Sequence, residues 1–127
     1  MFNYTQISHV SGAAPVQILF NVQHQMSVGV MVDSTMASVT KNGRKIVKAG
    51  TPLAGDLAAR ETPFKAAGEG DAVGVLLHDV DITEGNANGS LLIWGFVNLN
   101  RLESDTQALV TAGVKSALSG KVTFLKD

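Results

Sequence analysis

Residues Asp71–Leu102, DAVGVLLHDVDITEGNANGSLLIWGFVNLNRL, carry the clearest structural pattern of the chain. Within this stretch, two apolar runs, Ala72–Ile82 and Leu91–Leu99, flank a polar segment rich in glycine and asparagine. Valine, isoleucine, leucine and aromatic residues are typical of strands, whereas glycine and asparagine interrupt them. The stretch therefore predicts two strands joined by a loop.

Alternation along each run predicts two faces, and all of these faces are apolar. In the first run one face carries Val73, Val75 and Leu77, and the other carries Leu76, Val80 and Ile82. In the second run one face carries Leu91, Ile93 and Val97, and the other carries Leu92, Trp94 and Phe96. Because neither strand has a water-facing side, we expect a closed barrel, a sandwich or a subunit interface. Leu92, Trp94 and Phe96 are therefore candidates for the core or for an oligomer interface.

Length and composition narrow the protein classes. A chain of 127 residues predicts one domain, residues 1–127, with a core large enough to fold without a metal or disulfide. There are no cysteines, which excludes disulfides, thiolate zinc sites and cysteine nucleophiles. The net charge of −1 comes from 10 basic and 11 acidic residues without a run of either sign, which argues against a basic nucleic-acid-binding face.

The low content of charged residues says more about the surface of the protein than its net charge does. Charged residues make up 17% of the chain, against ~25% in typical soluble domains. Together with 45% hydrophobic residues and 13 glycines, this favours either an outer surface covered by partners or a small glycine-rich β-protein with an ordinary surface.

Nothing in the sequence predicts a membrane or secretory segment. No run reaches the ~18 apolar residues of a membrane span. The N-terminus, MFNYTQISHV, lacks the basic region and apolar core of a secretory signal. We expect a protein that is made in the cytoplasm and has no membrane partner.

Residues 1–15 form a candidate N-terminal arm. Phe2 and Tyr4 are two residues apart, as on one side of an extended segment, and Ile7 is a further apolar anchor. Such an arm could dock onto a partner, with Phe2, Tyr4 and Ile7 as its contacts. The alternative is a terminal strand of the domain's own sheet.

The middle of the chain predicts short strands and a long loop. Met26–Val32 has the composition of a strand, and Val39–Val47 predicts a hairpin because Asn42-Gly43 suits a type I′ turn. An extended segment follows at Pro52. Ala54–Gly70 predicts a long loop with a short helical turn near Asp56–Arg60.

Near the C-terminus the sequence predicts one helix and a last strand. Ser104 and Gln107 fit a capping box, an apolar stripe runs from Leu109 to Leu118, and Gly120 can end the helix. Lys121–Lys126 then predicts a strand. The predicted fold is mostly β, a small barrel or sandwich-like domain with one α-helix near the C-terminus and an extended N-terminal arm.

The only ionisable cluster of note is His78-Asp79-Val80-Asp81. On a strand His78 points away from Asp79 and Asp81, so the three cannot share one metal ion. Asp79 and Asp81 share a face, where they could bind calcium or pair with Lys or Arg across a strand. We favour a strand end that is solvated or salt-bridged over a metal site. The serines lack a nucleophile elbow, and the glycines lack phosphate-binding spacing. We therefore expect no metal, no cofactor and no catalytic residues.

Three blocks of the chain carry a family resemblance. They are RKIVKAGTPL, AVGVLLHDVDIT and GFVNLNRL, at residues 44–53, 72–83 and 95–102, and GKVTFLKD closes the chain. In this order they resemble the small head proteins of tailed bacteriophages, the head decoration or head fibre base proteins, and are similar to lambdoid head decoration proteins. Together the matching blocks cover 38 of the 127 residues.

The resemblance implies a virion protein without catalytic activity. It implies a mostly-β domain that binds the outside of the capsid, commonly as a trimer at local three-fold positions, and cements adjoining major capsid subunits. Its N-terminal arm would order on the shell. A different class stays open, because AGTPLAGDL at residues 49–57 also resembles β-clip modules of sugar-binding and assembly-chaperone proteins. In that case Trp94 or Tyr4 would stack on a carbohydrate or contact a folding partner.

Overall fold

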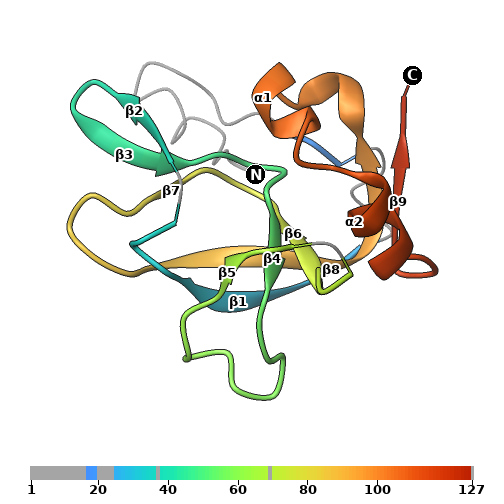
Figure 1. Ribbon diagram of the computed structural model, residues 1–127, viewed down its shortest axis with the longest axis horizontal. Helices are drawn as coiled ribbons and strands as arrows, with labels where there is room; N and C mark the ends of the chain where they lie inside the picture. Colours follow the sequence, from blue (N-terminus) through green and yellow to red (C-terminus); the bar gives the residue numbers. More distant parts are fainter. Residues whose placement is uncertain (1–16, 20–24, 37, 69, 127) are drawn as a thin grey trace, which may run out of the picture.

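The long strand β8, Ala87–Asn98, organises the larger sheet. In the computed structural model, which describes residues 17–19, 25–36, 38–68 and 70–126, β8 lies across the middle of the molecule (Figure 1). It pairs antiparallel with β1 (Met26–Val32) and with β6 (Gly74–Leu76). It also pairs in parallel with β9 (Val122–Leu125). The strand order is β1-β8-β6-β4-β5, with β4 at Pro52–Ala54 and β5 at Lys65–Ala66.

A second sheet contains β2, β3 and β7. The hairpin of β2 (Val39–Lys41) and β3 (Arg44–Val47) projects to one side, and β3 also pairs with β7 (Val80–Asp81) (Figure 1). Its turn has φ of 53° at Asn42 and 77° at Gly43. These positive angles are what a type I′ turn requires, so the predicted hairpin is confirmed.

The mostly-β prediction is confirmed: the described residues form two sheets, and among them neither sheet closes into a barrel. The predicted strand over Ala72–Ile82 is two short strands, β6 and β7, in different sheets. The predicted loop before Leu91 is also shorter, because β8 begins at Ala87. Gly89 lies inside β8 and opposite Val30, at a point where an added Cβ would come within 2.9 Å of Val80. This close approach explains a glycine within a strand.

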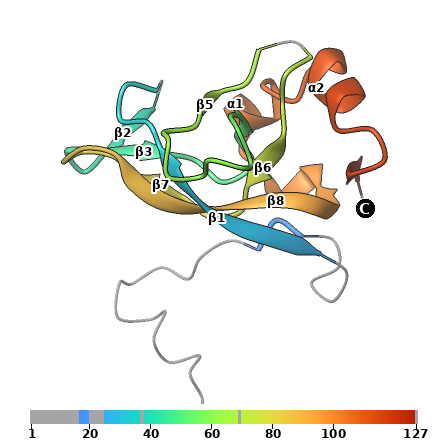
Figure 2. The ribbon, with the colours of Figure 1, turned by 90° about the horizontal axis from the view of Figure 1, so that it is seen from below.

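Two hydrophobic cores lie against β8, so the prediction of apolar packing on both faces is confirmed. Leu91 and Leu92 are both 0% exposed, yet each belongs to a different core. The helices, β5 and β6 lie on one side of β1 and β8 in Figure 2. The core around Leu92 includes residues from the C-terminal segment, namely Leu102, Val110, Val114, Leu118 and Val122. The core around Leu91 is built from the strands and the loop before β6, with Val30, Val32, Val47, Leu53, Phe64 and Ile82 among its members.

The prediction of one C-terminal helix is wrong. The structure has a 3₁₀ turn, η2 (Leu99–Arg101), and two short helices, α1 (Ser104–Gln107) and α2 (Ala112–Ala117). The predicted capping box of Ser104 and Gln107 does not form. The N-cap of α1 is Glu103, and the Gln107 side chain donates to the Leu102 carbonyl at 3.0 Å instead. Thr111 starts the second helix, because its side chain accepts a hydrogen bond from the Val114 N–H. The apolar stripe predicted from Leu109 to Leu118 is therefore interrupted at Thr111, where α2 begins.

The loop over residues 54–70 is held by one buried aromatic residue. Phe64 is 0% exposed, donates its N–H to the Met31 carbonyl at 2.7 Å and accepts from the Asp33 N–H at 3.0 Å. The predicted helical turn is a hydrogen-bonded turn in which Ala59 N–H donates to the Asp56 carbonyl at 3.0 Å. The long-loop prediction therefore holds except for the short strand β5.

Candidate functional site

An exposed apolar face lies on β8 where its pairing passes from β1, at residues 87–94, to β9, at residues 95–98. Met26 is 57% exposed, Trp94 46% and Leu125 37%, and Phe96 is partly exposed. The strand register brings them together, because Met26 lies opposite Trp94 and Leu125 lies opposite Asn98, two residues beyond Phe96. Residues that are paired across strands, or two apart along one, share a face. We call Met26, Trp94, Phe96 and Leu125 the Trp94 face.

A β-bulge explains why Trp94 is not in the core. Between Met26 and Ser27, β1 advances one residue while β8 advances two, from Trp94 to Leu92. An extra residue in one strand reverses the face taken by the side chains beyond it. Accordingly, Val97 and Leu92 lie in the same core. They are five residues apart, and strict alternation would place residues an odd number apart on opposite faces. The predicted alternation is correct at Leu92 and wrong beyond the bulge.

The candidates Leu92, Trp94 and Phe96 are therefore separated. Leu92 is 0% exposed and is a core residue. Trp94 and Phe96 lie on the opposite face of β8, and Trp94 is almost half exposed. Sequence reasoning missed Met26 and Leu125 as their neighbours. Alternation along the last strand could have indicated Leu125. Val122 and Phe124 contact the core, so Leu125, one residue after Phe124, points to the other face.

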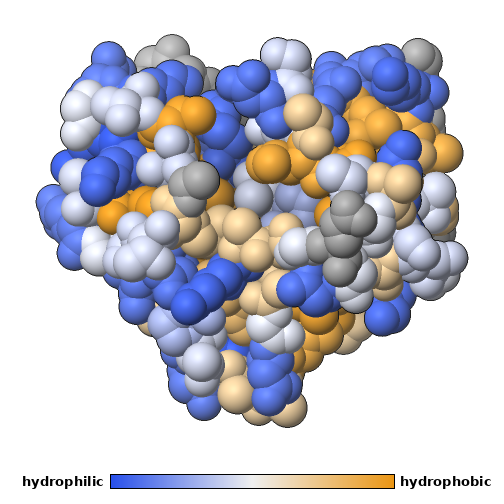
Figure 3. Space-filling view, in the orientation of Figure 1, coloured by the Kyte–Doolittle hydropathy of each residue, from blue (hydrophilic) through white to orange (hydrophobic). Residues whose placement is uncertain are grey.

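The Trp94 face contains no charged residue. Charges on β9 lie beyond its two ends, at Lys121 and Lys126. A further apolar side chain, Leu109, is 48% exposed between α1 and α2. In Figure 3 apolar residues reach the surface among polar ones over the part of the molecule where Figure 1 places the helices and β9. The Trp94 face, on the other side of β8 from the helices, is a separate exposed apolar surface, and both surfaces suit contact with another macromolecule.

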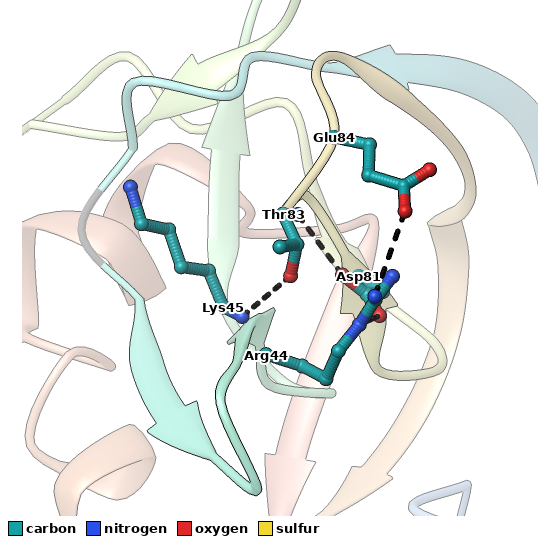
Figure 4. Close-up of polar contacts among 5 residues, drawn as sticks. All are labelled: Arg44, Lys45, Asp81, Thr83 and Glu84. Atoms are coloured by element: carbon teal, nitrogen blue, oxygen red, sulfur yellow. Dashed lines mark hydrogen bonds and ion pairs between the residues drawn. The ribbon is translucent and has the colours of Figure 1, made fainter.

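A polar cluster joins the β2–β3 hairpin to β7 and the turn after it (Figure 4). Arg44 Nε–H donates to Asp81 Oδ2 at 2.7 Å, and Arg44 Nη1 lies 3.6 Å from Glu84 Oε2. The backbone N–H of Lys45 donates to Thr83 Oγ1 at 2.7 Å, and the Thr83 N–H donates to Asp81 Oδ1 at 2.9 Å. The contacts link neighbouring segments of one sheet, so the cluster has a structural role.

These contacts perturb the acid–base properties of Asp81. Hydrogen bonds from Thr83 and Arg44 stabilise the carboxylate and lower the pKa of Asp81 from 3.8 to about 2. The same carboxylate raises the pKa of Arg44. Because both side chains are exposed, this ion pair is a surface contact.

Lys48 connects three parts of the chain. Its side chain is only 13% exposed, and its Nζ lies 2.7 Å from Glu103 Oε2 and 3.3 Å from Asp79 Oδ2. The hydrogen bond to Glu103 is the main reason why the pKa of Lys48 is raised. Asp79 Oδ1 also accepts the Ala49 N–H at 2.8 Å. Of the solvated and salt-bridged alternatives predicted for Asp79 and Asp81, the structure shows the salt-bridged one.

The polar segment beside β7 lines an open hollow of about 400 Å³. Its lining comes from β1, β8, the start of β7 and the segment before β7, with Gly29, His78, Asp79, Val80, Asn88, Gly89 and Ser90. The Asp79 carboxylate in it is already engaged by Lys48 and Ala49. In the part of the chain that the structure describes, no three His, Asp or Glu residues converge as metal ligands.

The chain matches no protein-family model and no curated protein sequence. Among the described residues no helix is both long and apolar enough to cross a membrane. The predicted arm contacts Phe2, Tyr4 and Ile7 lie outside the described residues. Of the predicted binding residues, Trp94 and Phe96 lie within the described part of the chain, and both belong to the Trp94 face.

Proposed function

We propose that this protein is a bacteriophage capsid decoration protein, which binds the outer surface of the major capsid shell and stabilises the head without catalysis. The observation that carries the proposal is the exposure of Trp94 and its apolar neighbours on a hydrogen-bonded sheet. Large aromatic residues in such settings commonly dominate the free energy of protein–protein association. The resemblance of three sequence blocks to phage head proteins supports the choice of partner.

In this proposal the mechanism is binding energy alone. Each copy contacts adjoining major capsid subunits, so that the shell can rupture only if those contacts also break. A homo-oligomer, a trimer in the favoured form, presents several such contacts at once, and multivalency strengthens weak contacts without new chemistry. The arm, through Phe2, Tyr4 and Ile7, adds a strand to an exposed sheet edge of the shell. The protein lies on the exterior of the virion.

The test is co-sedimentation with capsids of the phage that encodes the protein. The unmodified chain should pellet with capsids, and Trp94→Ala should weaken binding about tenfold or more, as loss of an aromatic hot spot does. Leu57→Ala is the matched control, because Leu57 is 40% exposed and lies in the loop after β4, outside the Trp94 face. Binding that is absent in the unmodified chain, or unaffected by Trp94→Ala, contradicts the proposal.

Two further measurements examine the oligomer and the arm. Light scattering on the purified chain should give about three times the chain mass of 13.3 kDa. Deletion of residues 1–15 should reduce capsid binding. If it leaves binding unchanged, the arm is not part of the contact.

A carbohydrate-binding module is the second candidate function. The half-exposed ring of Trp94 favours it, because an exposed indole can stack on a sugar ring. Trp94 is the single tryptophan of the chain, so intrinsic fluorescence reports on this position alone. A glycan that changes this fluorescence, in a monomer that does not bind capsids, would support the second candidate over the first.

A further inference from the structure

Strand β9 leaves one backbone edge open. In parallel pairing, alternate residues turn their N–H and C=O groups toward the partner strand. The Gly95 N–H donates to the Lys121 carbonyl at 2.9 Å, and Gly95 is paired with Val122. This register turns the backbone groups of Thr123 toward β8 and those of Phe124 away from it. Within the described part of the chain no strand pairs with β9 on that outer side.

The open edge adjoins the Trp94 face. Thr123 and Leu125 have exposed side chains, whereas Val122 and Phe124 contact the core. In Figure 1 β9 lies at the margin of the molecule, where an added strand has access. Such a strand would gain main-chain hydrogen bonds from the edge and would place every second side chain beside Leu125.

The surroundings of β9 are cationic. Between Thr106 and Lys126 the charged residues are Lys115, Lys121 and Lys126, and the segment has no acidic residue. No ion pair involves these lysines within the described residues. Lys121 and Lys126 flank β9 at its two ends, and Asp127, which follows, lies outside the described residues.

These charges discriminate between possible occupants of the edge. A second copy of β9 in the symmetric antiparallel register, with Phe124 opposite Phe124, would place Lys121 of one copy at the same end of the strand pair as Lys126 of the other. At each end the lysines would outnumber the acidic residues, and like charges that lie close together disfavour a strand pair. The arm, residues 1–15, contains no Asp or Glu that could neutralise the two lysines. A segment of a different protein with acidic residues at both ends adds no lysine to the strand pair and supplies a carboxylate to each of Lys121 and Lys126.

We infer that β9 accepts an extended segment of a different protein, apolar at alternate positions and carrying a carboxylate at each end, which pairs with the outer edge of the strand. This inference rests on the proposed function only in assigning the segment to the capsid shell. Main-chain pairing supplies the affinity, and Lys121 and Lys126 select the charge of the partner.

The experiment titrates the ¹⁵N-labelled full chain with the peptide acetyl-Glu-Val-Thr-Val-Thr-Val-Glu-amide. Amide shifts should be concentrated at residues 122–126. The Phe124 N–H should exchange rapidly in the free protein and become protected with peptide, whereas the Thr123 N–H should be protected in both. The same peptide with lysine at both ends should bind about three- to tenfold more weakly, the effect expected of two exposed charge pairs.

Charge reversal supplies the matched comparison. Lys121→Glu with Lys126→Glu should reverse the preference, so that the lysine-ended peptide binds more tightly. Lys41→Glu with Lys45→Glu makes the same change in net charge on the β2–β3 hairpin, at the opposite end of the view in Figure 1, and should leave the preference unchanged.

Three outcomes would overturn the inference. They are no peptide-induced shift in β9, equal binding of both peptides, and a Phe124 N–H whose protection rises with protein concentration in the absence of peptide. The last result would identify a second copy as the occupant. Peptide binding by a protein that ignores capsids would contradict the proposed function alone, and capsid binding by a protein that ignores both peptides would contradict this inference alone.

Discussion

At the scale of single residues, Asp81 makes stability depend on pH. Its pKa is about 2 in the folded protein against an ordinary value of 3.8, so the unfolded chain takes up the proton first as the pH falls. The stabilisation is therefore complete above the ordinary value and is lost as the pH approaches 2. We expect the urea midpoint of Asp81→Asn to lie below that of the unmodified chain at pH 6, and the difference to shrink toward pH 2.

Direct titration of the Asp81 carboxyl group by NMR checks the cause. The midpoint should be about 2 in the unmodified protein. It should rise in Arg44→Gln, because the guanidinium group that donates to Asp81 at 2.7 Å is lost. A midpoint at the ordinary value of 3.8 in the unmodified protein would show that these contacts do not persist in solution.

At the scale of the elements, β6 can approach β8 closely because Gly74 has no side chain. A Cβ at Gly74 would lie 2.5 Å from the Leu92 carbonyl oxygen and 2.7 Å from Leu91 Cγ. Since a backbone atom is in the way, the strands must separate. We expect Gly74→Ala to lower the free energy of unfolding by about 1–3 kcal/mol, the usual cost of overpacking. Urea unfolding measures this change.

Gly29→Ala is the matched control in β1. A Cβ at Gly29 would meet no atom within 4 Å, so the change should stay within about 0.5 kcal/mol. Equal effects of Gly74→Ala and Gly29→Ala on the free energy of unfolding would mean that the close approach of β6 and β8 is not the cause of the destabilisation.

At the scale of the whole molecule, two cores share one strand. Phe64 and Leu118 are each 0% exposed, one in each core, and β8 contributes to both. Phe64→Ala should therefore cost about 3–5 kcal/mol and Leu118→Ala about 2–5 kcal/mol. Because β8 couples the cores, each variant should still unfold in a single transition, with coincident circular dichroism and Trp94 fluorescence. Two separate transitions would show that the cores unfold independently.

Much of the architecture could be predicted from local sequence. Met26–Val32 is the strand that its composition predicts, and the hairpin follows from the positive φ angles that Asn42-Gly43 accepts. The mostly-β class and the burial of Leu91 and Leu92 on opposite faces follow from two apolar runs without a polar side. These features depend on backbone preferences and side-chain period, which a short segment carries by itself.

Contacts between distant segments decided the rest. The bulge in β8 depends on pairing with β1 and turns Trp94 away from Leu92, so the candidate site could be named by residue but not grouped correctly. Leu125 joins Trp94 only through the parallel pairing of β9. The division of the predicted helix at Thr111 and the burial of Phe64 likewise arise where the chain packs against itself. Local sequence is enough to specify which segments are extended and which are apolar. Tertiary structure alone decided which apolar side chains remain at the surface, because a one-residue change of register reverses the face of every side chain beyond it.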